Sequence, residues 1–183
     1  MKLSLFLFVV SLICFGLQFE PAQSYVIWNN ADIAHGQWWR IVSGNFTHTN
    51  FAHLAMDLAG LWIIGFVFHP KVQTTFAVML LLSIIVGTSL LATNIHNYLG
   101  LSGILHGLVA YFAFTEALQG RKSSALLVIA VIAKVVWDQV VGPSTLTSEW
   151  IDAPIATQAH FSGLLGGLGL GLSAHLTRKW KWK

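Results

Sequence analysis

Six apolar runs divide the chain, and each is long enough, or nearly long enough, to cross a lipid bilayer. A transmembrane helix needs about 20 predominantly apolar residues. Only 9% of the 183 residues are charged, whereas the average soluble chain has about 25%. The sequence therefore predicts an all-α membrane protein in which residues 1–183 form a single domain with six transmembrane helices. The expected spans are residues 3–19, 51–68, 75–93, 101–118, 124–141 and 155–176.

The positions of lysine and arginine predict the orientation of these spans, because cytoplasmic connections carry an excess of both residues. If the N-terminus is cytoplasmic, only Arg40 lies in an outer loop, and Lys134 lies within a span. The other basic residues are then cytoplasmic, namely Lys2, Lys71, Arg121, Lys122, Arg178, Lys179, Lys181 and Lys183. Alternatively, the first run is a signal peptide cleaved after residues 22–24, but it exceeds the usual apolar core of about 7–15 residues.

Composition narrows the possible partners. The basic residues cluster only in the last six residues. A nucleic-acid-binding protein needs a basic stripe on a folded surface, so this sequence does not indicate one. Cys14 is the single cysteine, so an intramolecular disulfide and a cysteine metal cluster are both excluded. We therefore expect the lipid bilayer as a partner, and we expect no nucleic acid, cofactor or metal.

Polar residues within the spans are costly in hydrocarbon, so each is a functional candidate. With the orientation above, the second, fourth and sixth spans all run inward from the outer surface. His53, Ser102 and His160 lie near the start of these three spans and therefore share one depth. The candidates as a whole are His53, Asp57, Ser102, His106, Glu116, Lys134, Asp138 and His160.

A serine and a histidine at one depth suit nucleophilic acyl transfer. A serine hydroxyl becomes an effective nucleophile when a base removes its proton, and a neutral imidazole is such a base. Ser102 stands at the expected start of a helix, where unpaired backbone N–H groups can stabilise an oxyanion. Gly100 and Gly103 flank this serine, and they allow a peptide or a neighbouring helix to approach it closely.

Several of these residues also have purely structural interpretations. A lone serine in a transmembrane helix usually bonds back to the preceding turn, and His160 alone can be an interhelical histidine. His53 and Asp57 are four residues apart, so they can pair with each other. Gly163 and Gly167 have the GxxxG spacing of close helix packing.

Lys134 and Asp138 are also four residues apart. We interpret them as an ion pair within the fifth span, without a chemical role. Glu116 lies near the cytoplasmic end of its span and can reach the interface.

Four motifs together resemble those of a known family. They are "GLSG" at Gly100–Gly103, "AHFSGLLGG" at Ala159–Gly167, "HTNFAHLAMD" at His48–Asp57, and "WWR" ending at Arg40. In this combination and order, the chain resembles the rhomboid intramembrane serine proteases, and it is most similar to the rhombosortases. The resemblance extends from the first outer loop to the sixth span.

The resemblance implies a six-helix bundle and a role for each matching residue. Ser102 corresponds to the nucleophile and His160 to the general base. His53 corresponds to the histidine on the oxyanion side. Arg40 corresponds to the arginine that stabilises the first outer loop.

Two positions depart from the usual rhomboid pattern. Asp57 stands where rhomboids usually have asparagine, and an ionised aspartate cannot donate a hydrogen bond to an oxyanion. Asp57 is therefore protonated, orients His53, or faces elsewhere. His106 stands where typical rhomboids have a tyrosine, and "GLSGILHG" resembles the rhombosortases. We expect the His106 ring to pack against His160 and to help fix its orientation.

The implied activity is cleavage of membrane-anchored proteins near the outer face of the membrane. For a rhombosortase, the substrate would carry a C-terminal tail with a Gly-Gly motif, an apolar helix and basic residues. The implied location is a bacterial inner membrane, with both termini cytoplasmic and the active site open to the periplasm. One alternative is a housekeeping rhomboid protease with other membrane-protein substrates.

Two alternatives lie outside proteolysis. Eight histidines together with Asp57 and Asp138 can indicate a metal or proton transporter. Four of the histidines, however, are scattered between a loop and the opposite side of the membrane: His35, His48, His69 and His175. An inactive rhomboid-like binding protein is disfavoured because both Ser102 and His160 are present.

Overall fold

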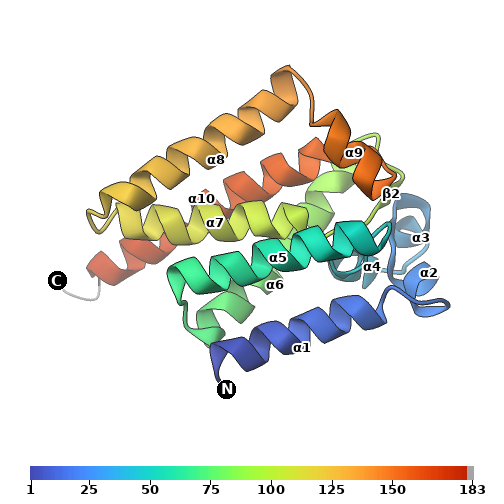
Figure 1. Ribbon diagram of the computed structural model, residues 1–183, viewed down its shortest axis with the longest axis horizontal. Coiled ribbons are helices and arrows are strands. Elements are labelled where there is room, and N and C mark those ends of the chain that lie inside the picture. The colour runs from blue at the N-terminus through green and yellow to red at the C-terminus, as the bar shows by residue number, and fades with distance from the viewer. Residues whose placement is uncertain (181–183) are drawn as a thin grey trace.

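Six helices form a bundle in the computed structural model, which describes residues 1–180 (Figure 1). Each of the six overlaps one of the predicted spans, with boundary shifts of a few residues. They are α1 (Leu3–Gly16), α5 (Phe51–Phe68), α6 (Val72–Ser89), α7 (Ser102–Ala117), α8 (Lys122–Val140) and α10 (Thr157–Trp180).

The shorter elements gather at one end of the bundle (Figure 1). Strand β1 pairs antiparallel with β2, and this pairing joins the first long loop to the segment that precedes α7. The short elements are α2 (Ala22–Val26), β1 (Trp28–Asn29), α3 (Asn30–Ala34), α4 (Arg40–Ser43), the 3-10 turns η1 (Gly44–Phe46) and η2 (Leu90–Ala92), β2 (Asn97–Tyr98) and α9 (Thr145–Ile151).

Three helical segments are long and apolar enough to cross a membrane, namely Phe51–Phe68, Val72–Ala92 and Lys122–Val140. This finding supports a multi-pass membrane protein. With 14 and 16 residues, α1 and α7 are shorter than the usual span of about 20 residues. In α10, glycine, histidine and hydroxyl side chains interrupt the apolar sequence. The count of six spans therefore stays a prediction.

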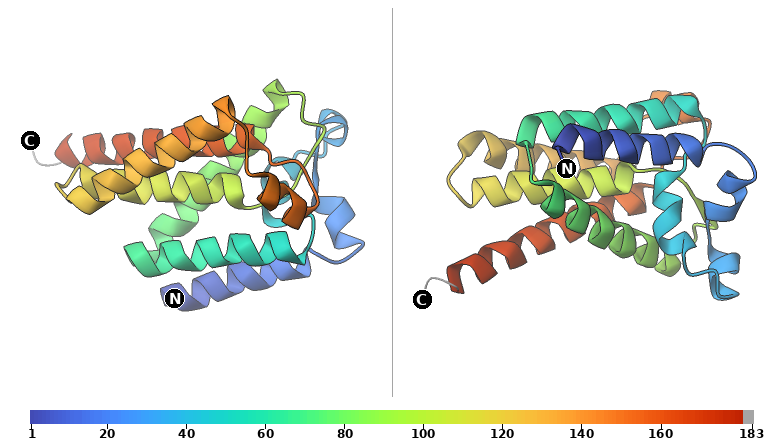
Figure 2. Two further views of the ribbon diagram at one scale, coloured as in Figure 1. Left: turned by 45° about the horizontal axis from the view of Figure 1, so that its top comes forward. Right: turned by 90° about the horizontal axis from the view of Figure 1, so that it is seen from below.

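Helix α7 occupies the centre of the bundle. More than half of its residues are buried, and its closest neighbour is α10, which lies alongside it in the left view of Figure 2. Small residues make this approach possible. A side chain at Gly163 of α10 would collide with the carbonyl oxygen of Gly103, and one at Gly167 would collide with that of Gly107. The packing contact expected for the GxxxG motif is therefore present.

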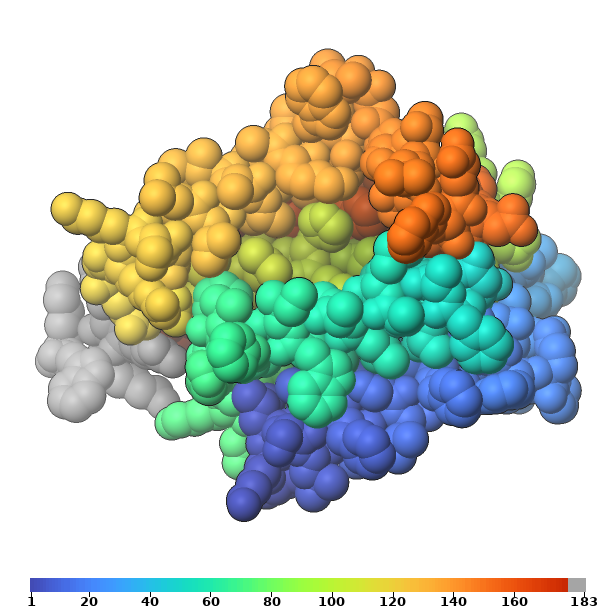
Figure 3. Space-filling model, in the orientation of Figure 1, coloured from blue at the N-terminus to red at the C-terminus, as the bar shows by residue number. Residues whose placement is uncertain are grey.

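Helix α8 lies at the periphery, where it forms the upper left edge of the molecule in Figure 3. Among its 19 residues only Ser124, Val135 and Asp138 are buried, while apolar side chains such as Leu126 and Val140 are exposed. An outward apolar surface is what a helix against lipid requires. The buried Asp138 is the exception on this helix, and it faces the bundle.

The two ends of the bundle differ in charge. The N-terminus, the α5–α6 and α7–α8 connections and the end of α10 lie together at one end (Figure 1). The basic residues Lys2, Lys71, Arg121 and Lys122 belong to these segments. Lys181 and Lys183, which contribute to the predicted cytoplasmic cluster, lie outside the described residues. This arrangement is the one that the orientation predicted from basic residues requires.

Candidate active site

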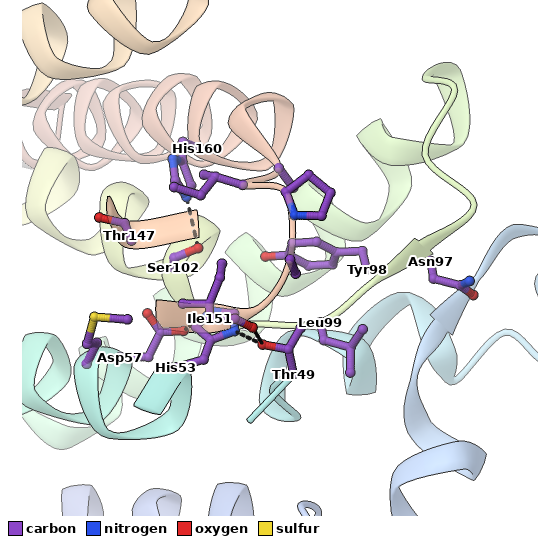
Figure 4. A pocket seen from close by; sticks show the side chains of 15 residues that line it. Thr49, His53, Asp57, Asn97, Tyr98, Leu99, Ser102, Thr147, Ile151 and His160 are labelled. Carbon is purple, nitrogen blue, oxygen red and sulfur yellow. Dashed lines mark hydrogen bonds and ion pairs between the residues drawn. The ribbon is translucent and has the colours of Figure 1, made fainter. Parts of the chain in front are cut away.

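Ser102 and His160 meet at the end of the bundle opposite the basic segments. Ser102 is the first residue of α7, and His160 lies in the first turn of α10. The Ser102 Oγ atom lies 2.9 Å from His160 Nε2, a hydrogen-bond distance (Figure 4). The two residues are 58 positions apart in the sequence, so helix packing alone brings them together.

The glycine contacts between α7 and α10 lie directly below this pair. Gly103 follows Ser102, and Gly163 is one helical turn beyond His160. A side chain at Gly163 would collide with backbone atoms of Gly103, and no rotamer change could make room for it. The backbone of the two helices therefore sets the separation of Ser102 from His160.

His106 supports the His160 ring from one face. The two rings stack with their centroids 4.1 Å apart and their planes inclined by 17°. His106 Nδ1 lies 2.8 Å from the carbonyl oxygen of Ser102, to which it donates a hydrogen bond. The rings therefore pack as the sequence led us to expect, and His106 is itself anchored to the backbone of the serine.

Asp57 is surrounded by groups that donate hydrogen bonds. Its Oδ2 accepts a hydrogen bond from the Leu101 N–H at 2.8 Å and one from His48 Nε2 at 3.1 Å. His53 Nε2 lies 3.4 Å from the same oxygen. Of the three alternatives for Asp57, this geometry supports orientation of His53. The carboxylate also holds the peptide that precedes Ser102.

Sequence reasoning gave His48 no role, because it placed this residue in a loop. His48 does lie in a loop, between η1 and α5, but its side chain is fully buried against Asp57. The only signal in the sequence was its nearness to His53 in one polar motif. That signal does not reveal which way the loop folds.

His53 is also fixed from its other ring nitrogen. Thr49 donates its hydroxyl to the Ile151 carbonyl at 2.6 Å and lies 3.1 Å from His53 Nδ1. Asn50 Nδ2 donates to the Trp150 carbonyl at 3.0 Å. These bonds attach α9 to the start of α5, so α9 covers this side of the site.

Gly100 adopts a backbone φ of +132° next to His53. A side chain there would come within 2.8 Å of the His53 ring, so glycine is needed for both conformation and space. Tyr98 donates its hydroxyl to the Gly100 carbonyl at 2.7 Å. Burial, and then the charge of Asp57, raise the pKa of Tyr98 well above its usual range. Tyr98 therefore remains protonated and acts as a hydrogen-bond donor.

Arg40 lies away from Ser102 and organises the first long loop. Its guanidinium donates to the carbonyl oxygens of Ser24 and Ile27 at 3.0 and 2.6 Å. It also donates to the Gln37 side chain at 2.7 Å and contacts Asp32 at 3.2 Å. This is the loop-stabilising arrangement that the family resemblance implied.

A cavity of about 340 Å³ lies above the Ser102–His160 pair. Residues of α9 and of the loop that follows it line one part of the cavity, and Ser102 and His160 line another (Figure 4). Within residues 1–180, no three His, Cys, Asp or Glu side chains are grouped so as to hold a metal ion. The lining residues are Thr49, His53, Met56, Asp57, Asn97, Tyr98, Leu99, Ser102, Thr147, Ile151, Ala153, Pro154, Ile155, Ala156 and His160.

Asp138 connects α8 to the same site. The predicted ion pair with Lys134 is present. Asp138 Oδ2 also lies 3.6 Å from His160 Nδ1, and the Asp138 side chain is only 3% exposed. The sequence spacing indicated the partner on the same helix but not the contact with α10.

Comparison with known proteins identifies the family. The sequence profile of the Rhomboid domain matches residues 35–176, which is most of the chain. The chain belongs to the rhomboid family.

Two rhomboid relatives show the extent of the similarity. One is YdcA of Bacillus subtilis (strain 168), whose name places it among the rhomboid proteases. It is 25% identical over 166 residues, which is 80% of this chain and 75% of YdcA. The other is the rhomboid protease GlpG of Photorhabdus laumondii, which is 25% identical over 154 residues. That match covers 81% of this chain but only 51% of GlpG, so this rhomboid spans about half the length of that relative.

Proposed function

We propose that this rhomboid is an intramembrane serine protease with Ser102 as nucleophile and His160 as general base. The observation that carries the proposal is the 2.9 Å contact between Ser102 Oγ and His160 Nε2, two residues that line the same cavity. Membership of the family adds support, since rhomboid homologues are intramembrane serine proteases.

Acylation begins when His160 Nε2 takes the Ser102 hydroxyl proton. The Oγ atom then forms a bond with a substrate peptide carbonyl carbon, and negative charge moves to the carbonyl oxygen. The N–H of Ser102 has no acceptor within its own helix because Ser102 is the first residue of α7. In this proposal the Ser102 N–H stabilises the oxyanion, and His53 contributes a second hydrogen bond when its Nε2 carries a proton.

Asp57 acts behind the oxyanion site in this mechanism. Its Oδ2 accepts the Leu101 N–H and lies 3.1 Å from His48 Nε2, so this oxygen is already engaged on the side away from the substrate. It therefore holds the Leu101–Ser102 peptide and the His53 ring in place, and the contact with the oxyanion is left to other groups.

The intermediate collapses when the bond between the carbonyl carbon and the amide nitrogen breaks. His160 gives its proton to the departing amine, which leaves an ester between Ser102 and the substrate. His160 then takes a proton from a water molecule that attacks the ester carbonyl. The bond to Oγ breaks, Ser102 regains its proton, and a carboxylic acid product leaves.

Labelling with a fluorophosphonate tests this proposal. The reagent forms a bond with an activated serine, so purified wild-type protein should be labelled. Ser102→Ala removes the nucleophile and His160→Ala removes the base, and neither variant should be labelled. Labelling that persists in Ser102→Ala would contradict the assignment of Ser102 as the nucleophile.

The proposal includes six transmembrane spans with both termini in the cytoplasm of a bacterial cell and the cavity open to the periplasm. The basic segments at one end of the bundle support this orientation, and the Ser102–His160 pair lies at the other end. Cysteine accessibility tests it. A cysteine at exposed Trp38 in the first loop should react with an impermeant maleimide on intact spheroplasts, whereas one at exposed Gln119 in the α7–α8 connection should not.

We further propose that the substrate class is that of a rhombosortase. The sequence "GLSGILHG" and the stacking of His106 on His160 support this subgroup. Reporter proteins with a C-terminal Gly-Gly motif, an apolar helix and basic residues should be cleaved. A matched reporter in which the two glycines are replaced by leucine should not be cleaved. Equal cleavage of both reporters would favour a housekeeping rhomboid.

A further inference from the structure

The second ring nitrogen of His160 needs an acceptor. To take the Ser102 proton, Nε2 must be unprotonated, so the neutral ring carries its proton on Nδ1. Nδ1 is buried, and in the described part of the chain no group forms a hydrogen bond with it. A buried N–H without an acceptor costs about 1–3 kcal/mol. In the alternative tautomer Nδ1 has no proton and needs no acceptor. The proton is then on Nε2, the nitrogen that has to act as the base.

His106 cannot supply this acceptor. Its ring lies parallel to that of His160, and an acceptor for a ring N–H has to lie near the plane of that ring. Its own Nδ1–H is used on the Ser102 carbonyl. His106 therefore limits the tilt of His160 but does not determine which nitrogen carries the proton.

Asp138 is placed to accept the Nδ1 proton of His160. It reaches the His160 ring from α8, with Oδ2 3.6 Å from Nδ1, while Ser102 lies at the opposite nitrogen. This separation is longer than a formed hydrogen bond of about 2.7–3.2 Å. Catalytic hydrogen bonds are often long without substrate and tighten when it binds. A small movement of the carboxylate is enough to complete the bond.

Lys134 provides the charge that keeps Asp138 available as an acceptor. An isolated carboxylate in a low-dielectric interior tends to take up a proton. The Lys134 ammonium contacts the same Oδ2 atom from one helical turn away. It does not need to be buried for this purpose, and its side chain is 51% exposed.

We propose that Asp138 is a positioning residue that accepts the Nδ1 proton of His160 and so maintains the tautomer in which Nε2 is the base. This inference rests on the proposed protease function. It adds an acidic third residue, supplied by a peripheral helix, to the serine–histidine pair. It also replaces the interpretation of Lys134 and Asp138 as an ion pair without chemistry.

A purely structural role for Asp138 is the competing explanation, and the neighbouring residue offers a matched control. Gln139 donates its side-chain amide to the Thr157 carbonyl at 2.8 Å, so it also ties α8 to α10. It is exposed, and its side-chain hydrogen bond goes to Thr157 and not to His160. If Asp138 only holds the two helices together, Gln139→Ala should have a similar effect.

The test measures kcat and KM for a membrane-anchored reporter, the rate of fluorophosphonate labelling, and the unfolding midpoint of the full-length protein. In Asp138→Asn the new amide can donate to Nδ1 and favour the wrong tautomer. We therefore expect this variant to lower kcat and the labelling rate by at least about 10- to 100-fold, the range for groups that orient histidine ligands in metal sites. KM and the unfolding midpoint should not change. Asp138→Glu, which restores an acceptor, should recover part of the loss, and Gln139→Ala should match the wild type.

The outcomes separate the two proposals. If labelling requires Ser102 and His160 but proceeds at the wild-type rate in Asp138→Asn, only the role of Asp138 is overturned. Equal losses in Asp138→Asn and Gln139→Ala would also overturn it. Labelling that is independent of Ser102 would overturn the protease function itself. If Asp138→Asn unfolds, Lys134→Met is the substitute test, because the Lys134 side chain is half-exposed and its replacement leaves the core intact. A lower kcat is expected in this variant, and a wild-type kcat would contradict the proposal.

Discussion

Replacing Gly163 with alanine should separate Ser102 from His160. The new methyl group would overlap the Gly103 carbonyl oxygen, whereas ordinary contact begins at 3.4 Å. Both positions are on helix backbones, so no side chain can rotate to make room. Overfilled contacts of this kind shift the backbone, and α10 must therefore move away from α7 by about 1 Å or more.

The loss can be estimated from the geometry of the pair. Ser102 Oγ and His160 Nε2 are 2.9 Å apart, and a displacement of about 1 Å takes them beyond the reach of about 2.6–3.2 Å that proton transfer needs. A misplacement of this size costs about 100-fold in rate. That factor corresponds to about 2.7 kcal/mol of transition-state stabilisation. We therefore expect kcat to fall about 100-fold in Gly163→Ala.

Gly169→Ala is the matched control on the same helix. A methyl group at Gly169 meets nothing within 4 Å, so its activity should equal that of the wild type. Both variants would be purified and compared by labelling rate, reporter cleavage and unfolding midpoint. Wild-type activity in Gly163→Ala would refute the conclusion that the glycine contact sets the distance between Ser102 and His160.

Substitutions at three further positions test individual contacts. His106→Phe should retain most of the reporter cleavage if ring packing on His160 is sufficient, whereas His106→Ala should lose it; equal losses would show that the hydrogen bond to Ser102 is needed. Gly100→Ala should abolish labelling of Ser102, because its methyl group meets the His53 ring at 2.8 Å; a normally labelled variant contradicts this. Asp57→Leu should lower the free energy of unfolding by about 1–3 kcal/mol because it leaves the Leu101 N–H unpaired. Asp57→Asn keeps an acceptor and should lose less, so equal losses in the two variants would argue against this hydrogen bond.

The positions of Ser102 and His160 could be inferred from the sequence because they depend on simple features. The apolar runs locate the helices, and the alternating direction of successive helices places both side chains at the same end of the bundle. The glycines at positions 103 and 163 then indicate that the two helices approach closely. None of these inferences requires knowledge of a loop conformation.

The environment of Asp57 could not be inferred in the same way. Its partners His48 and Leu101 come from two loops, and each contact depends on how a non-helical segment folds back. Periodicity carries no information about such segments. The sequence therefore left three roles open for Asp57, and only the fold distinguishes among them.

Asp138 illustrates a related limit within a helix. A spacing of four residues predicts the contact with Lys134 whatever surrounds the helix, but the contact with His160 depends on which face of α8 lies against α10. Hydrocarbon offers no water to a carboxylate, so a buried aspartate must find donors within the protein. Among the described residues, the buried acids are Asp57 and Asp138. Asp57 accepts the N–H of Leu101, the residue before Ser102, and Asp138 lies 3.6 Å from the His160 ring. The two buried acids of the described residues therefore both lie beside Ser102 and His160, where they can orient the groups of the candidate pair.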